Sequence, residues 1–170
     1  DFDEVEMTDW QMYIETLPGG GSNLPNFTRR GPRGESRWTT RAQWVRAHRG
    51  EFMYEDHGTP WSVITRNLDV TVSRPAEEYR GQARFSNGTV AFQQYVPFRI
   101  DMTSTFGIDG GRLEFDSIEL DSEGAETRLV GVADLNRFPE MTYEMRSAID
   151  FPTQKAIWFA KDDFTVDGSG

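Results

Sequence analysis

Apolar and polar residues alternate along most of the chain after residue 51, with almost no helical periodicity between them. Within residues 98–108, the apolar side chains Phe98, Ile100, Met102, Phe106 and Ile108 are separated by polar residues or glycine. A period of two is typical of a β-strand with one apolar and one polar face. The same alternation recurs at 113–120 and 143–151. The pattern therefore predicts an all-β protein.

Turn signals divide this pattern into short strands. Asp109-Gly110-Gly111 and the segments 56–60 and 122–124 predict turns, and Asn87-Gly88 is the strongest short hairpin signal in the chain. The connections are mostly short, which favours sequential antiparallel hairpins. We expect about ten to twelve strands, followed by one or two helical turns at 152–159 because proline is favoured at the start of a helix.

The N-terminal part has a different organisation. Residues 2–15 alternate in two parities, and the change at Thr8-Asp9 predicts a bulge or a short break. Residues 17–37 contain five glycines and three prolines and are predicted to form a long surface loop. We interpret residues 1–170 as a single all-β segment of a larger protein.

A long sheet with one apolar face must cover that face. It can pair with a second sheet as a β-sandwich, close into a barrel, or curve into an open trough. The modest apolar content of the strands and their short connections favour a long antiparallel meander curved into a U-shaped trough, with the β-sandwich as the alternative. The trough would hold its lining side chains inside, whereas the same residues would form the core of a closed sandwich or barrel.

The candidate lining consists of apolar side chains that share the inward parity of the predicted strands. They are Phe85, Phe92, Phe98, Ile100, Met102, Phe106, Ile108, Leu113, Phe115, Ile118, Leu120, Leu129, Met145 and Ile149.

Composition narrows the classes of partner. The formal net charge of -10 argues against general nucleic-acid binding, because a phosphate backbone requires a basic surface. Seven arginines and one acid lie in residues 29–50, which we interpret mainly as a solvated loop and an outward strand face, or as a rim for anionic headgroups or an acidic partner. The chain has no cysteine and no stretch of about 20 apolar residues that would span a membrane.

Several segments resemble the bacterial AsmA-like proteins, and especially their TamB-like branch. They are residues 49–61, Asn67–Val72, Gly81–Val90, Asp109–Leu120 and Leu129–Leu135, with 2–14 followed by a Gly/Pro-rich segment. In that family a strand, a Gly-Gly turn and the pattern Leu-x-Phe-x-x-Ile-x-Leu repeat many times. The order and spacing of these segments carry the resemblance more than any one of them.

The resemblance implies a periplasmic protein, tethered to the inner membrane by a segment outside this chain. It implies a long sheet bent into a trough, often called a β-taco, whose apolar groove shelters phospholipid acyl chains. The expected role is lipid transport between membranes or outer-membrane biogenesis, with envelope membrane proteins as partners. Such transport requires no catalytic residue and no cofactor, and unpaired terminal strands would favour self-association.

Other chemistry is weakly signalled. The tryptophans Trp38, Trp44 and Trp61 could stack on sugars, so a secreted carbohydrate-binding β-sandwich is the alternative function. The two histidines, His48 and His57, are too few for a His-rich metal site, and no phosphate-binding loop or nucleophile elbow occurs. We therefore predict a protein that is not an enzyme, with no metal site and no nucleic-acid partner.

Overall fold

The computed structural model describes residues 2–24, 42–75, 78–138, 140–159 and 163–170. Within these ranges nine strands form one sheet, and one helix follows the last strand. The elements are β1 (Phe2–Thr8), β2 (Gln11–Thr16), β3 (Ala42–Asp56), β4 (Trp61–Ser73), β5 (Tyr79–Phe92), β6 (Phe98–Asp109), β7 (Arg112–Ser122), β8 (Ala125–Asp134), β9 (Met141–Ile149) and α1 (Phe151–Phe159).

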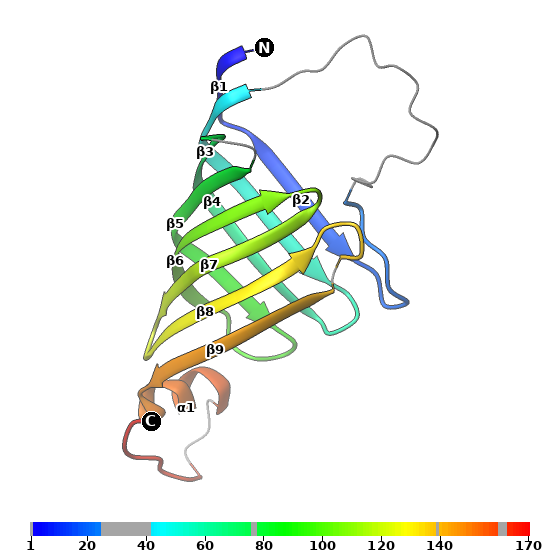
Figure 1. Ribbon diagram of the computed structural model, residues 1–170. Coiled ribbons are helices and arrows are strands. Elements are labelled where there is room, and N and C mark those ends of the chain that lie inside the picture. Colours follow the sequence, from blue (N-terminus) through cyan, green and yellow to red (C-terminus); the bar gives the residue numbers. More distant parts are fainter. Residues whose placement is uncertain (1, 25–41, 76–77, 139, 160–162) are drawn as a thin grey trace.

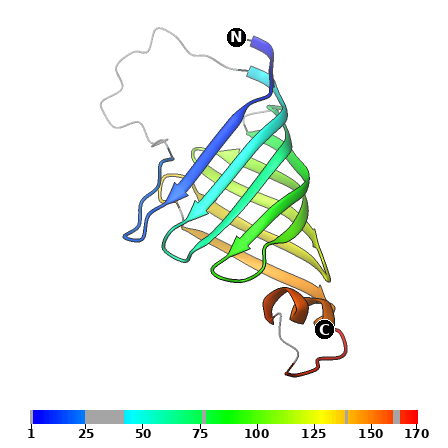
Figure 2. The ribbon, with the colours of Figure 1, turned by 180° about the vertical axis from the view of Figure 1, so that it is seen from behind.

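The strands from β3 to β9 follow one another across the sheet, each antiparallel to the next. This order confirms the predicted all-β meander. The sheet curves without closing, so that β1–β5 form one wall and β6–β9 the other (Figure 1 and, from behind, Figure 2). All nine strands belong to this one sheet, and the described residues contain no second sheet facing it.

The N-terminal strands depart from the predicted antiparallel order. Both β1 and β2 run parallel to β3, and they lie end to end along it, β1 beside 42–48 and β2 beside 51–56. The break between them falls at Asp9, whose φ is 55°, as the change of parity predicted. A parallel pair needs a connection of a dozen or more residues, and the chain between Thr16 and Ala42 is long enough. Residues 25–41 of that connection, including Trp38, lie outside the described residues.

Two of the long strands contain β-bulges. The register shifts between Ala47 and Gly50 in β3, and between Phe85 and Gly88 in β5. A bulge adds a residue to one strand and increases its bend without ending it. The described residues contain nine strands, fewer than the ten to twelve expected for the whole chain, and one reason is that the bulge at Asn87-Gly88 was predicted to be a turn between two strands.

The hairpin predicted at Asn87-Gly88 is wrong, because both residues lie inside β5. Asn87 has a φ of 58°, and its backbone N–H donates to Asp101 at 2.6 Å. The ring of Phe85 covers Gly88 so closely that a Cβ there would lie 2.6 Å from it. In an Asn-Gly pair, asparagine tolerates a positive φ and glycine has no side chain. This bulge needs both properties, and so does a tight turn, so the two cannot be told apart from this pair alone.

Other local signals are confirmed. The turn at 109–111 joins β6 to β7, and Gly110 and Gly111 have φ values of 55° and 94°. The helical turns predicted at 152–159 form α1. Asp150 precedes this helix and accepts a hydrogen bond from the Thr153 backbone N–H at 2.9 Å, and hydrogen bonds from the Thr153 side chain and backbone lower the pKa of Asp150. No described helix is long and apolar enough to span a membrane.

Candidate functional site

Strand register brings the predicted lining onto one face of the sheet. Partners across an antiparallel sheet lie on the same face, and Phe85, Met102 and Leu120 form one such row across β5, β6 and β7. A second row joins Ile118 and Leu129 to Met145 on β9. Register and alternation place all fourteen predicted residues on this face, which we call the apolar face.

The apolar face is only partly buried. Among the described residues, the hydrophobic side chains that are buried are Ala47, Tyr54, Leu68, Phe85, Phe106, Ala133 and Ile157. Most of the predicted lining is half-buried, and Met145 at the end of its row is 60% exposed. A protein interior normally covers such residues almost completely. Among the residues that the structure describes, this face therefore has apolar contacts in the plane of the sheet but no complete layer above it.

The helix α1 covers one end of the apolar face. The Trp158 ring lies 5.8 Å from Phe92 and 5.7 Å from Phe98, measured between ring centroids. Tyr95 lies in the connection between β5 and β6, and its ring centroid is 5.1 Å from that of Trp158. Phe92 and Phe98 thus pack against the helix in this structure, and the remaining predicted lining extends away from it.

The sheet curves toward its apolar face. Tyr54 on β3 and Phe138 in the connection between β8 and β9 are separated by several strands of the sheet, yet their ring centroids are 6.1 Å apart. Tyr54 also packs against Trp61, with centroids 4.7 Å apart. These contacts join the two walls at one corner. Tyr54 was not predicted to line the apolar face. The bulge in β3 changes which alternate residues of that strand point to this face, and the lining was selected by alternation.

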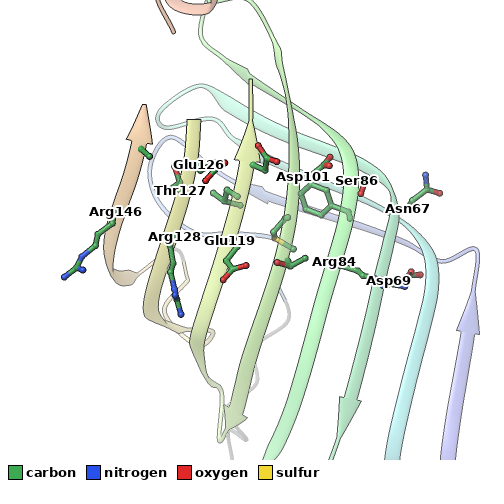
Figure 3. Close-up of a pocket in the computed structure, with 16 residues that line it drawn as sticks. Asn67, Asp69, Arg84, Ser86, Asp101, Glu119, Glu126, Thr127, Arg128 and Arg146 are labelled. Carbon is green, nitrogen blue, oxygen red and sulfur yellow. Dashed lines mark hydrogen bonds and ion pairs between the residues drawn. The ribbon is translucent and has the colours of Figure 1, made fainter. Parts of the chain in front are cut away.

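The opposite face, which we call the polar face, carries a row of charged side chains beside a shallow depression of about 760 Å³ (Figure 3). Register aligns Asp69, Arg84, Thr103 and Glu119 across β4 to β7, and continues the row to Arg128 and Arg146 on β8 and β9. Twelve of the sixteen residues that line the depression belong to the polar face or its bulges. The sequence did not predict this row. Alternation shows which residues of one strand share a face, but not which residues of neighbouring strands lie beside one another.

Asp69 is the most connected carboxylate of this row. Its oxygens lie 3.3 Å from His48 Nδ1 and 3.4 Å from an Arg84 nitrogen, and the Arg49 backbone N–H donates to it at 3.2 Å. Partial burial alone would raise the pKa of Asp69, but these hydrogen bonds and the His48 charge outweigh burial and lower it. The carboxylate joins the β3 bulge to β4 and β5.

A second polar cluster lies where β2 meets β3. The Tyr13 hydroxyl is 2.9 Å from a Glu15 oxygen and 2.8 Å from a Glu55 oxygen, and the same two oxygens lie 3.6 and 3.7 Å from His57 Nε2. The hydrogen bond to Glu55, and then that to Glu15, raise the pKa of Tyr13 because ionisation would break both. The cluster fastens β2 to β3.

Other candidate chemistry finds little support in the geometry. Trp44 lies on the polar face and is 47% exposed, whereas Trp61 packs on the apolar face, so these two rings form no common platform for a sugar. Among the residues described, no group of three or more acidic, histidine or cysteine side chains is arranged to hold a metal ion.

Comparison with known proteins gives no match to a family model, to a curated protein or to a solved structure. The apolar face and the two polar clusters are therefore the observations from which a function can be argued.

Proposed function

We propose that this chain shelters phospholipid acyl chains against its apolar face, as a periplasmic segment of an AsmA-like or TamB-like protein that serves lipid transport or outer-membrane biogenesis. The observation that carries the proposal is a continuous apolar face on the inner side of a curved, unclosed sheet, which α1 covers at one end and no other described helix covers. The resemblance of the sequence segments supplies the envelope location and the tether outside this chain.

The energetics favour a chain-like apolar ligand. Burial of one methylene group stabilises a complex by about 0.8 kcal/mol, so even partial cover of an acyl chain offsets the cost of binding. A curved sheet with an open side accepts a long flexible ligand and leaves its headgroup in water. Movement along such a face needs no catalytic group, because each step exchanges one apolar contact for another.

The face also suits a ligand that must leave again. Its lining side chains are half-buried without a ligand, so the face keeps apolar contacts within the sheet and still exposes apolar area to a ligand. Met102 and Leu120 are half-buried neighbours in the row that begins at Phe85, and they are the residues we expect to contact acyl chains most.

The test is mass spectrometry of lipid extracted from the purified protein, with a matched pair of variants. Met102→Asp and Thr103→Asp introduce the same charge at adjacent positions, one on the apolar face and one exposed on the polar face. We expect phospholipid with the wild type and with Thr103→Asp, and loss of most of it with Met102→Asp. Circular dichroism establishes that each variant retains its β-structure.

Two results would overturn the proposal. One is the absence of acyl lipid from the wild type both after purification from cells and after incubation with phospholipid vesicles. The other is equal retention by the two folded variants, which would show that bound lipid does not contact the apolar face.

A further inference from the structure

The outer strands of the sheet are protected differently. Beside β2, the Asn23 side chain donates to the Tyr13 carbonyl at 2.9 Å and accepts from the Glu15 backbone N–H at 2.9 Å. Its own N–H also donates to the Glu15 carbonyl at 3.2 Å. Asn23 thus makes the hydrogen bonds that a neighbouring strand would make. The backbone groups of Tyr13 and Glu15 that it occupies are no longer available to another strand.

The last strand, β9, has almost no such protection. Among the described residues, only its final residue is paired on the outer side, where Ile149 and Gly170 exchange backbone hydrogen bonds of 2.7 and 3.0 Å. Residues 141–146 are all exposed, and Tyr143 and Met145 are 58% and 60% exposed. Within the described part of the chain, nothing else pairs with the outer edge of β9. It is therefore a strand edge available to a further strand.

The Ile149 bonds also define which groups point outward. Along a strand in an antiparallel sheet, backbone groups alternate between the two neighbours. Since Ile149 directs its N–H and carbonyl outward, Ser147, Met145 and Tyr143 do the same. A strand that pairs with this edge must place its own outward groups opposite these residues.

The charges on β9 favour a second copy of this chain as the strand that pairs with this edge, and they favour one register of the pair. Its polar-face side chains include one acid and one base, Glu144 and Arg146, on either side of Met145. We infer that two copies of this chain associate through their β9 strands, antiparallel and with the twofold axis at Met145. Glu144 of each copy then lies opposite Arg146 of the other, which gives two opposite-charge pairs.

The neighbouring registers are disfavoured. An axis at Glu144 would set that carboxylate opposite its own copy, and an axis at Arg146 would do the same with two guanidinium groups, and like charges directly opposite are destabilising. Arg146 is also paired in register with Arg128 on β8, and neither guanidinium contacts a carboxylate among the described residues. A glutamate from a second copy reduces this repulsion.

The β1 strand does not offer an equivalent site. It carries Asp3, Glu4 and Glu6 within seven residues and no base, so a second copy of the same strand would be repelled. Pairing through β9 is closed by its twofold axis and therefore gives dimers and not open chains. It also sets Met145 of each copy opposite Met145 of the other, with Tyr143 opposite Ser147.

Charge exchange tests the register. Glu144→Arg and Arg146→Glu each turn two attractive pairs into repulsive ones and should raise the dimer Kd by about tenfold or more in sedimentation velocity. An equimolar mixture of the two single variants should form a heterodimer, because each then presents the charge that the other lacks. Arg99→Glu, an exposed arginine on β6, is the matched control and should leave the Kd unchanged.

A cysteine variant tests the axis directly, since the natural chain has no cysteine. Met145→Cys sets two thiols opposite each other with Cα atoms about 5.5 Å apart, within disulfide range, whereas Ser147→Cys does not. Only Met145→Cys should give a covalent dimer on mild oxidation. A wild type that stays monomeric throughout the micromolar range, a ladder of higher oligomers, or a Kd unmoved by either charge reversal would each overturn the inference.

Discussion

Removal of the Phe106 side chain tests whether the apolar face is open. Phe106 is 8% exposed, its ring lies 6.5 Å from that of Phe115, and it covers Gly81, where a Cβ would lie 2.5 Å from the ring. Met145 belongs to the same face but is 60% exposed. The variants Phe106→Ala and Met145→Ala are therefore a matched pair. If the face is open, their losses of unfolding free energy should differ, and if both positions lie in a closed core, both losses should be large.

The expected magnitudes follow from burial. Burial of a phenylalanine side chain contributes about 1.5–3 kcal/mol, and its aromatic contact adds about 0.5–1.5 kcal/mol. Solvent and neighbouring side chains can occupy the space left on an open face, so little cavity cost is added. We expect Phe106→Ala to lower the free energy of unfolding by about 2–4 kcal/mol. Met145→Ala, which removes little buried area, should lower it by less than about 0.5 kcal/mol.

Urea unfolding measures both values in the Glu144→Arg background, in which pairing through β9 is disfavoured and no second copy covers Met145. The slope of the free energy against urea checks that the unfolded states are comparable. In a closed core, loss of a methionine side chain costs about 2–5 kcal/mol and loss of a phenylalanine about 3–5 kcal/mol. A cost above about 2 kcal/mol for Met145→Ala would therefore show that a second layer covers the face and would refute the open trough.

Two further predictions concern the polar side of the sheet. Asn87→Val should destabilise the protein by about 1–2 kcal/mol in urea unfolding, because a β-branched residue tolerates the positive φ poorly, whereas Asn87→Gly should be nearly neutral; equal costs would contradict the bulge. The lowered pKa of Asp69 means that the ionised group stabilises the fold above its unfolded pKa of about 4, and that this stability is lost as the pH falls through its lower folded value. Thermal unfolding should show a smaller acid-side loss for Asp69→Asn than for wild type, and identical pH profiles would contradict this assignment.

Alternation and turn residues predicted the central hairpins well. At 109–111 two glycines with positive φ lie between two alternating runs, so the local signal and the fold agree. At Asn87 the same kind of signal produced an error, because a bulge and a turn both require positive φ and a missing Cβ. What distinguishes them is the partner strand: Asp101 on β6 accepts the Asn87 N–H, and that contact depends on the register of a neighbouring strand.

Long-range features were the least predictable. The parallel pairing of β1 and β2 with β3 joins residues about 40 positions apart, and no local pattern encodes the direction of such a pair. The ion row through Asp69 likewise depends on the registers of several strands at once. The fourteen lining residues could be selected because they need only the correct parity within each strand, whereas Tyr54 and Leu68 were missed where a bulge changed that parity.

The open face and the open edge are physically connected through β9. Met145 is the most exposed large hydrophobic residue of the described chain, and it lies at the outer margin of the apolar face. A second copy paired at this strand would continue the apolar face across the twofold axis and cover that margin without closing the trough. Measurement of bound lipid with the Met145→Cys cross-linked dimer and with the monomeric Glu144→Arg variant separates the two proposals. Equal lipid per chain in both would show that acyl chains are held within one sheet, whereas lipid confined to the dimer would place the bound chains across the axis.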